Sequence, residues 1–133
     1  MFLNVCCLKS KLLYHDFYDL INKYDICLFV ETKTDDLDVL NVPNGYLYYC
    51  KPRSVIDKKS GGLTILYNEK FKPYLKFTKT NSELVQWVLI SNEILQDDKN
   101  LLLECVYIPP ENSKYASKEG FSEIEDEILV TIQ

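Results

Sequence analysis

The stretch Ile26-Cys27-Leu28-Phe29-Val30, followed by Glu31 and Thr32, decides the fold. Its apolar residues do not alternate with polar ones, and such a run is typical of a strand that is buried on both faces near the centre of an α/β sheet. Ligands and catalytic groups in open α/β sheets gather beyond the carboxyl ends of strands, so Glu31 is a candidate site residue. The alternative is an ordinary solvated glutamate at a strand end, since most surface carboxylates have no specific role.

The residues before this strand predict a strand–helix–strand unit. Residues 2–5 read as a short strand, and Ser10 can cap a helix that ends near residues 22–23. A helix between two neighbouring strands is a crossover connection, so the two strands should run parallel. The apolar residues that recur at helical spacing in this segment are Leu12, Leu13, Phe17, Leu20 and Ile21.

The rest of the chain predicts mainly strands. They are expected at 46–50, 63–67, 74–78, 85–91 and 101–108, with the last two forming an antiparallel hairpin across the polar turn 96–100. Gly61-Gly62 indicates a tight backbone approach where a loop enters a strand, rather than a phosphate-binding loop. Apolar residues between Phe121 and Leu129 predict a final amphipathic helix. With no linker or repeat, residues 1–133 are expected to form a single α/β domain.

Composition narrows the class of protein. Of the 133 residues, 47% are hydrophobic, which is typical of a globular domain, and no apolar run reaches the ~18 residues of a membrane span. The five cysteines show no two-residue spacing, so we expect reduced thiols and an intracellular location in the nucleus or cytoplasm. The adjacent pair Cys6-Cys7 could bind a soft metal, but a lone pair makes this the less favoured interpretation.

The net charge of −5 weighs against a protein that binds nucleic acid only through its overall charge. It weighs less against an enzyme, because a bound divalent cation can supply the positive charge that a phosphodiester requires. The one basic cluster is either a local site or a solvated loop, and it consists of Lys51, Arg53, Lys58 and Lys59.

Four segments together are more specific than a generic α/β pattern. They are residues 4–11, 25–32, 61–66 and 106–113, of which the last, Val-Tyr-Ile-Pro-Pro-Glu-Asn-Ser, is the most specific. In this order and spacing the chain resembles the N-terminal half of the endonuclease/exonuclease/phosphatase family. The likeness is greatest to the endonuclease domain of non-LTR (LINE-type) retrotransposons. The resemblance implies an α/β sandwich and Mg²⁺-dependent hydrolysis of phosphodiesters, with DNA favoured as the substrate.

The resemblance also implies a set of site residues. Glu31 matches the glutamate that binds the divalent cation, Asn4 matches an asparagine in the shell of the metal and phosphate, and Tyr107 matches an active-site tyrosine near the phosphate. Their chemistry suits these roles. A carboxylate oxygen is a hard ligand, an amide orients water or phosphate without adding charge, and a phenol can donate to a phosphoryl oxygen. Taken singly, Asn4 reads as a strand-end residue and Tyr107 as a strand aromatic.

The chain departs from the family pattern in two places. Cys6-Cys7 stands where relatives commonly carry arginine and glycine, and a cysteine lacks the freedom of glycine at positive φ. The aspartate-x-asparagine and aspartate-histidine segments expected after the last helix do not occur before Gln133. The resemblance therefore implies a truncated domain with an incomplete Mg²⁺ site and little or no hydrolysis. His15, on the first helix, is read as a surface residue rather than a substitute.

The truncation of the domain also predicts a feature of the fold. We expect a partial sandwich, mostly one mixed β-sheet with flanking helices, whose inner face and edge are left uncovered. Such a face favours self-association or a partner, and hence a non-catalytic interaction module as the alternative to a nuclease. A decayed element without catalytic function is the remaining alternative.

Overall fold

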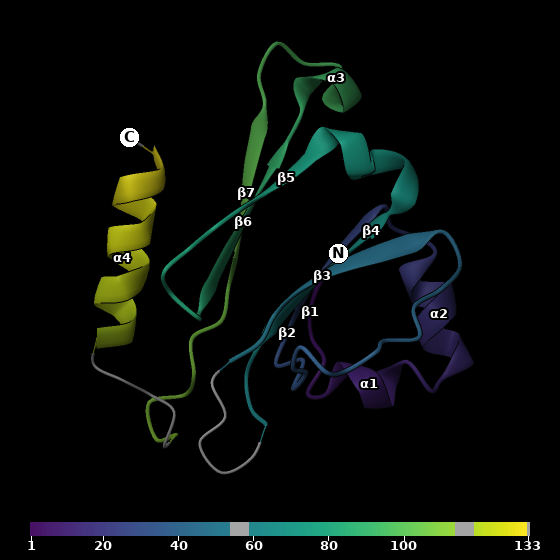
Figure 1. Cartoon of the computed structure of the whole chain (residues 1–133), viewed down its shortest axis with the longest axis horizontal. Helices are drawn as coiled ribbons and strands as arrows, with labels where there is room; N and C mark the ends of the chain where they lie inside the picture. The colour runs from purple at the N-terminus through teal and green to yellow at the C-terminus, as the bar shows by residue number, and fades with distance from the viewer. Residues whose placement is uncertain (54–58, 114–118, 133) are drawn as a thin grey trace.

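The computed structural model describes residues 1–53, 59–113 and 119–132. Two β-sheets lie face to face between helices, so that α4, the second sheet, the first sheet and the pair α1 and α2 follow one another across the molecule (Figure 1). The elements are β1 (Phe2–Asn4), α1 (Leu8–Lys11), α2 (His15–Ile21), β2 (Ile26–Val30), β3 (Tyr46–Lys51), β4 (Leu63–Asn68), the 3₁₀ helix η1 (Glu69–Tyr74), β5 (Leu75–Thr78), β6 (Val85–Ile90), α3 (Asn92–Leu95), β7 (Leu101–Val106) and α4 (Glu119–Ile132).

The first sheet is mixed and has the strand order β1-β2-β4-β3. β1 runs parallel to β2, with Asn4 opposite Val30, and this confirms the predicted crossover unit. β4 runs antiparallel to both of its neighbours, β2 and β3. The carboxyl ends of β1 and β2 therefore lie at the same edge of the sheet as the amino end of β4.

The outer face of the first sheet is covered by α1 and α2. Cys27 and Phe29 point to this side and are fully buried against helix residues, and Phe17 lies with its ring centre 5.6 Å from that of Phe29. The predicted single helix after Ser10 is in fact two short helices. The buried residues on this side are Val5, Leu8, Leu12, Phe17, Ile21, Cys27, Phe29, Leu40, Tyr46 and Leu66.

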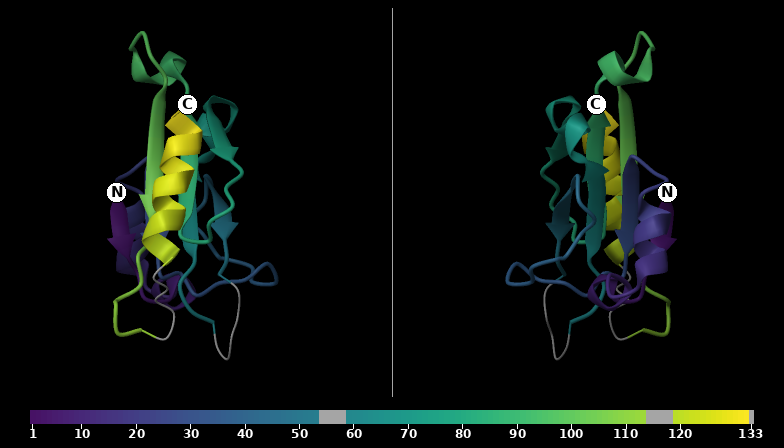
Figure 2. Two further views of the ribbon diagram at one scale, coloured as in Figure 1. Left: turned by 90° about the vertical axis from the view of Figure 1, so that its left-hand side faces the viewer. Right: turned by 90° about the vertical axis from the view of Figure 1, so that its right-hand side faces the viewer.

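The second sheet is antiparallel, with the order β5-β6-β7. The predicted hairpin is confirmed, since β6 pairs with β7 from Val85 opposite Val106 to Ile90 opposite Leu101. One face of this sheet packs on the first sheet, and the other packs on α4, which runs along it (Figure 2). The buried residues between the sheets are Leu28, Val30, Leu63, Ile65, Val88 and Cys105, and those under α4 are Leu84, Val85, Trp87 and Ile124.

The α/β sandwich class is confirmed, but the expected uncovered inner face is wrong. Residues 75–106 form a sheet of their own that covers the inner face of the first sheet. The reason is that β6 is apolar on both sides, with Val85 and Trp87 toward α4 and Val88 toward the first sheet. A strand buried on both faces needs a layer on each side. Among the described residues, no helix is long and apolar enough to cross a membrane.

The central role of the buried strand β2 gives a direct test of the core. Phe29→Ala should lower the free energy of unfolding by about 3–5 kcal/mol, because it removes a fully buried ring and leaves a cavity. Phe2→Ala, the same change at a side chain that is 56% exposed, should change it by about 0.5 kcal/mol or less. Urea unfolding followed by Trp87 fluorescence measures both. Equal losses in the two variants would contradict the assigned core.

Candidate active site at one edge of the sandwich

Glu31 and Tyr107 meet at one edge of the sandwich. Glu31 follows β2 of the first sheet and Tyr107 follows β7 of the second, and the Tyr107 hydroxyl donates a hydrogen bond to Glu31 Oε1. The two residues are 76 positions apart in the sequence. The backbone N–H of Tyr107 donates to the carbonyl of Leu84, with an N–O distance of 3.0 Å, which fixes the chain direction after β7. The packing of the two sheets thus brings together two of the three predicted site residues.

The backbone around Glu31 is held by hydrogen bonds from two directions. The N–H of Cys7 donates to the Glu31 carbonyl at 2.8 Å, and the N–H of Thr32 donates to the Gly62 carbonyl at 3.3 Å. Glu31 itself has a φ of 55°, in the left-handed region, which costs a residue with a side chain about 1 kcal/mol. Backbone strain of this kind is frequent at functional sites and persists only where the surroundings enforce it.

Asn4 ends the strand next to β2, and its side chain is engaged in a turn. It ends β1 opposite Val30, one residue before Glu31, and its side chain is exposed. Its Oδ1 accepts a hydrogen bond from the N–H of Cys6 at 3.1 Å and so closes the turn between β1 and α1. Asn4 is not among the described residues that line the cavity at Glu31. The structure therefore places Asn4 as a support of the turn, adjacent to the site.

A cavity of about 270 Å³ opens at Glu31 and Tyr107. The described part of its lining combines one carboxylate with three cationic side chains, a composition that suits an anion and a metal ion together. The hydroxyl oxygen of Ser60 is buried there and has no hydrogen-bond partner among the described residues. The lining residues are Glu31, Lys33, Arg53, Lys59, Ser60, Gly61, Tyr107, Pro109, Pro110 and Ser113.

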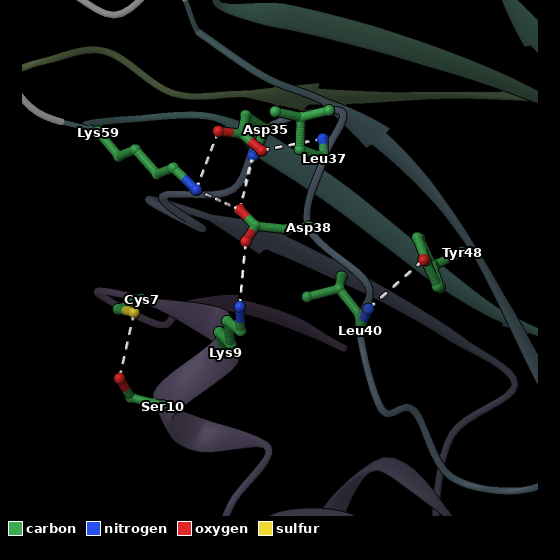
Figure 3. Close-up of polar contacts among 9 residues, drawn as sticks. All are labelled: Cys7, Lys9, Ser10, Asp35, Leu37, Asp38, Leu40, Tyr48 and Lys59. Carbon is green, nitrogen blue, oxygen red and sulfur yellow. Dashed lines mark hydrogen bonds and ion pairs between the residues drawn. The ribbon is translucent and has the colours of Figure 1, made fainter.

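A network of ion pairs holds Lys59 at this cavity (Figure 3). Lys59 Nζ lies 2.6 Å from Asp38 Oδ2 and 2.9 Å from Asp35 Oδ2, and Lys9 Nζ of α1 lies 3.1 Å from Asp38 Oδ1. The hydrogen bond from Lys59 is the main cause that holds the pKa of Asp38 well below its usual range. The network joins α1, the 35–38 loop and the segment before β4. Its two carboxylates compensate the charge of Lys59.

Gly61 and Gly62 let the chain pass closely behind Glu31. The carbonyl of Gly61 accepts from the N–H of Lys33 at 2.9 Å, and both glycines have positive φ. A Cβ atom on Gly62 would lie 3.0 Å from Thr32 Oγ1, and one on Gly61 would lie 2.9 Å from Cδ of Arg53. The interpretation of this pair as a tight backbone approach is confirmed.

Burial and hydrogen bonding set the protonation of the site residues. Burial raises the pKa of the Tyr107 phenol, and the hydrogen bond and charge of Glu31 raise it further, so the phenol remains a hydrogen-bond donor at neutral pH. The pKa of the Cys7 thiol is lowered, chiefly by its hydrogen bond with Ser10. In contrast, burial raises the pKa of Cys27 to about 11 and that of Cys105 to about 12.

The predicted basic cluster does not form one patch. Arg53 and Lys59 line the cavity, whereas Lys51 Nζ donates to Thr80 Oγ1 and, at 3.0 Å, to the carbonyl of Val85, and Lys58 lies outside the described residues. Lys33 was not predicted. Glu31 and Lys33 both lie beyond the end of β2 at positive φ, where strand alternation does not apply, so no sequence pattern marked this position.

Another cavity is larger but less suited to phosphate chemistry. It measures about 620 Å³ and lies between α4 and the segment before β6. Four carboxylates line it together with Arg53, and a surface of that charge repels anions. Glu127 also accepts hydrogen bonds there from the N–H groups of Asn81 and Ser82.

His15 is a surface residue, as predicted, with its side chain 89% exposed and paired with Asp19 at 3.7 Å.

Glu31 is the one carboxylate among the described residues that line the cavity of about 270 Å³. No group of three or more histidine, cysteine, aspartate or glutamate side chains that could hold a metal occurs within residues 1–53, 59–113 and 119–132. Magnesium can nevertheless bind through one or two carboxylates together with waters and substrate phosphates, so a single glutamate is compatible with it.

Neither a protein-family model nor a curated protein sequence matches the chain.

Gly45 and Gly62, two of the glycines at positive φ, provide a matched pair of variants. Gly45→Ala meets no atom within 4 Å, so only its φ of 85° is unfavourable, and the free energy of unfolding should fall by about 1 kcal/mol. Gly62→Ala has a similar φ of 88° and also approaches Thr32, so a loss larger by about 1 kcal/mol or more is expected. Chemical denaturation measures the difference. Equal losses would show that the Gly62 approach is not tight.

The raised pKa of Tyr107 predicts a dependence of stability on pH. Above the ordinary tyrosine pKa of 10.0, the unfolded chain loses this proton while the folded protein keeps it, so the free energy of unfolding falls as pH rises. The contribution is fully present below that value. Tyr107→Phe should therefore lose less stability than the wild type as the pH rises above about 10. Urea unfolding at several pH values measures the slopes.

The matched control for this prediction is Tyr14→Phe, at a side chain that is 66% exposed. Since that ring lies in water in both states, the free energy of unfolding of Tyr14→Phe should change with pH in parallel to that of the wild type. A Tyr107→Phe curve that is also parallel to the wild type would contradict the partly buried hydrogen bond to Glu31.

Proposed function

We propose that this edge of the sandwich is a divalent-cation site for phosphodiester chemistry of the endonuclease/exonuclease/phosphatase type, with DNA as the substrate. The observation that carries the proposal is the hydrogen bond between Tyr107 and Glu31. The sequence resemblance assigns the two residues to one site, and they meet although they come from different sheets. A chance likeness of short motifs would not require this meeting.

Glu31 is the residue proposed to hold the cation. Its Oε1 accepts from Tyr107, which leaves Oε2 as a hard oxygen ligand of the kind that Mg²⁺ prefers. When bound, the cation would supply positive charge at a phosphoryl oxygen. Asn4 is proposed to act in the shell of this site, through the turn that it closes with Cys6.

The remaining residues of the cavity are proposed to bind the phosphate and orient it. Tyr107 remains protonated at neutral pH, so its single O–H can donate to a phosphoryl oxygen in place of Glu31 when a phosphate is bound. Lys33 and Arg53 lie at the same cavity and would attract the phosphate, whereas the charge of Lys59 is compensated by Asp35 and Asp38. The hydroxyl of Ser60 is a further polar group at this point.

The proposed site is part of an active site of the retrotransposon endonuclease type. Residues 1–133 supply the proposed cation ligand and phosphate contacts, while the family's aspartate-x-asparagine and aspartate-histidine positions have no match in this sequence. Those groups provide the general acid–base part of the chemistry. We therefore expect metal and phosphate binding to be retained and hydrolysis by this chain to be weak or absent.

Manganese provides the test of the cation site. Adding Mn²⁺ to the ¹⁵N-labelled protein should broaden the NMR signals of amides close to Glu31, above all those of Thr32, Cys7 and Gly62, because the paramagnetic ion acts over short distances. Mg²⁺ in excess should reverse the effect. Glu31→Gln removes the charged ligand but keeps the shape, and it should abolish the broadening.

Glu69→Gln, at an exposed glutamate of η1, is the matched control and should leave the broadening unchanged. Broadening that is centred elsewhere, or that survives Glu31→Gln, would count against the site. Nicking of supercoiled plasmid is assayed in parallel. Nicking that needs Mg²⁺ and disappears in Glu31→Gln, but not in Glu69→Gln, would show that this chain is catalytically active after all.

A further inference from the structure

Cys6 and Cys7 differ from the other cysteines in their exposure. Cys6 is exposed and Cys7 is half-buried, whereas Cys27 and Cys105 are at most 1% exposed. Cys50, also half-buried, lies in β3 with its sulfur 3.3 Å from Thr64 Oγ1. Reagents in solution attack accessible sulfur atoms, so Cys6, the one exposed cysteine of the five, is the sulfur best placed for thiol chemistry in the folded state.

Polar groups contact both sulfur atoms of the pair. Lys33 Nζ donates to Cys6 Sγ at 3.5 Å, and Cys7 Sγ lies 3.2 Å from Ser10 Oγ. Lys33 also lines the cavity at Glu31. The Cys6 thiol therefore lies next to a cationic side chain that it shares with the candidate active site.

The backbone of the pair is strained and is part of the same edge. Cys6 has a φ of 46° and Cys7 a φ of 99°, values that side-chain-bearing residues adopt at a cost of about 1–3 kcal/mol. Their N–H groups donate to Asn4 Oδ1 and to the Glu31 carbonyl. A group attached to either sulfur would therefore lie on the turn whose N–H groups bind Asn4 and Glu31.

We propose that Cys6-Cys7 is a thiol modification site for small anionic disulfides, with Cys6 as the sulfur that reacts first. In this exchange, the Cys6 sulfur attacks one sulfur of the disulfide, a new S–S bond forms as the old one breaks, and the displaced sulfur leaves as a thiolate. The Cys6 proton passes to solvent, and the disulfide is the only oxidant. Lys33 attracts the anionic reagent to Cys6. The inference does not rest on the proposed nuclease function.

The test uses 5,5′-dithiobis(2-nitrobenzoate), an anionic disulfide that releases a coloured thiolate for each thiol it modifies. The native protein should show a fast phase that peptide mass mapping assigns to Cys6, whereas all five thiols react in denaturant. Cys6→Ser should remove the fast phase, and Cys7→Ser should retain it. A fast phase that maps to Cys27, Cys50 or Cys105 in the native wild type would overturn the proposal, without reliance on any variant.

A charge variant tests the role of Lys33. Lys33→Gln should slow the anionic reagent about threefold, the effect expected of one partly exposed charge, and added salt should slow the wild type similarly. The neutral reagent 4,4′-dithiodipyridine should react with both proteins at nearly the same rate. Lys72→Gln, at an exposed lysine of η1, is the matched control and should behave as the wild type. Equal rates of the anionic reagent with Lys33→Gln and the wild type would contradict the proposed attraction.

Discussion

The packing of the two sheets against each other is the constraint on which the rest of the structure depends. Val30 of β2 is buried in this interface, and Tyr107, which follows β7, packs against the same cluster. The next residue after Val30 is Glu31, so the contact that excludes water from the core also sets the distance between the two candidate site residues. The free energy of apolar burial is proportional to the area buried and does not depend on orientation. Here the register of the strands fixes which side chains face each other.

The edge beyond these strands is held by backbone hydrogen bonds rather than by regular structure. Glu31, Lys33, Cys6 and Cys7 all have positive φ, as do Gly61 and Gly62. The N–H of Lys33 and that of Thr32 both donate to the glycine segment, and that of Cys7 donates to Glu31. Three segments that are far apart in sequence thus fix one another, which is how an unfavourable conformation can persist at Glu31.

Periodicity in the sequence predicted most of the elements, because burial on one or both faces leaves a repeating apolar pattern. The strands at β2, β4, β6 and β7 and the parallel start of the first sheet were found in this way. The sequence did not reveal that β5–β7 form a separate sheet, since the apolar pattern shows that a face is buried but not what covers it. Lys33 and Ser60 were missed for a related reason. Their role depends on contacts across the edge, and nothing in their own segments marks them.

The charges at this edge have consequences for what it can hold. Lys59 is compensated by Asp35 and Asp38, and Oε1 of Glu31 is occupied by the Tyr107 phenol. A phenol whose pKa is raised donates a hydrogen without adding charge, so Glu31 keeps its carboxylate available through its other oxygen. In the proposed function, a cation bound there would add to the positive charge of the cavity that Lys33 and Arg53 line, and added positive charge attracts an anion. In the proposed function, the metal ion and the phosphate would therefore each favour the binding of the other at this edge.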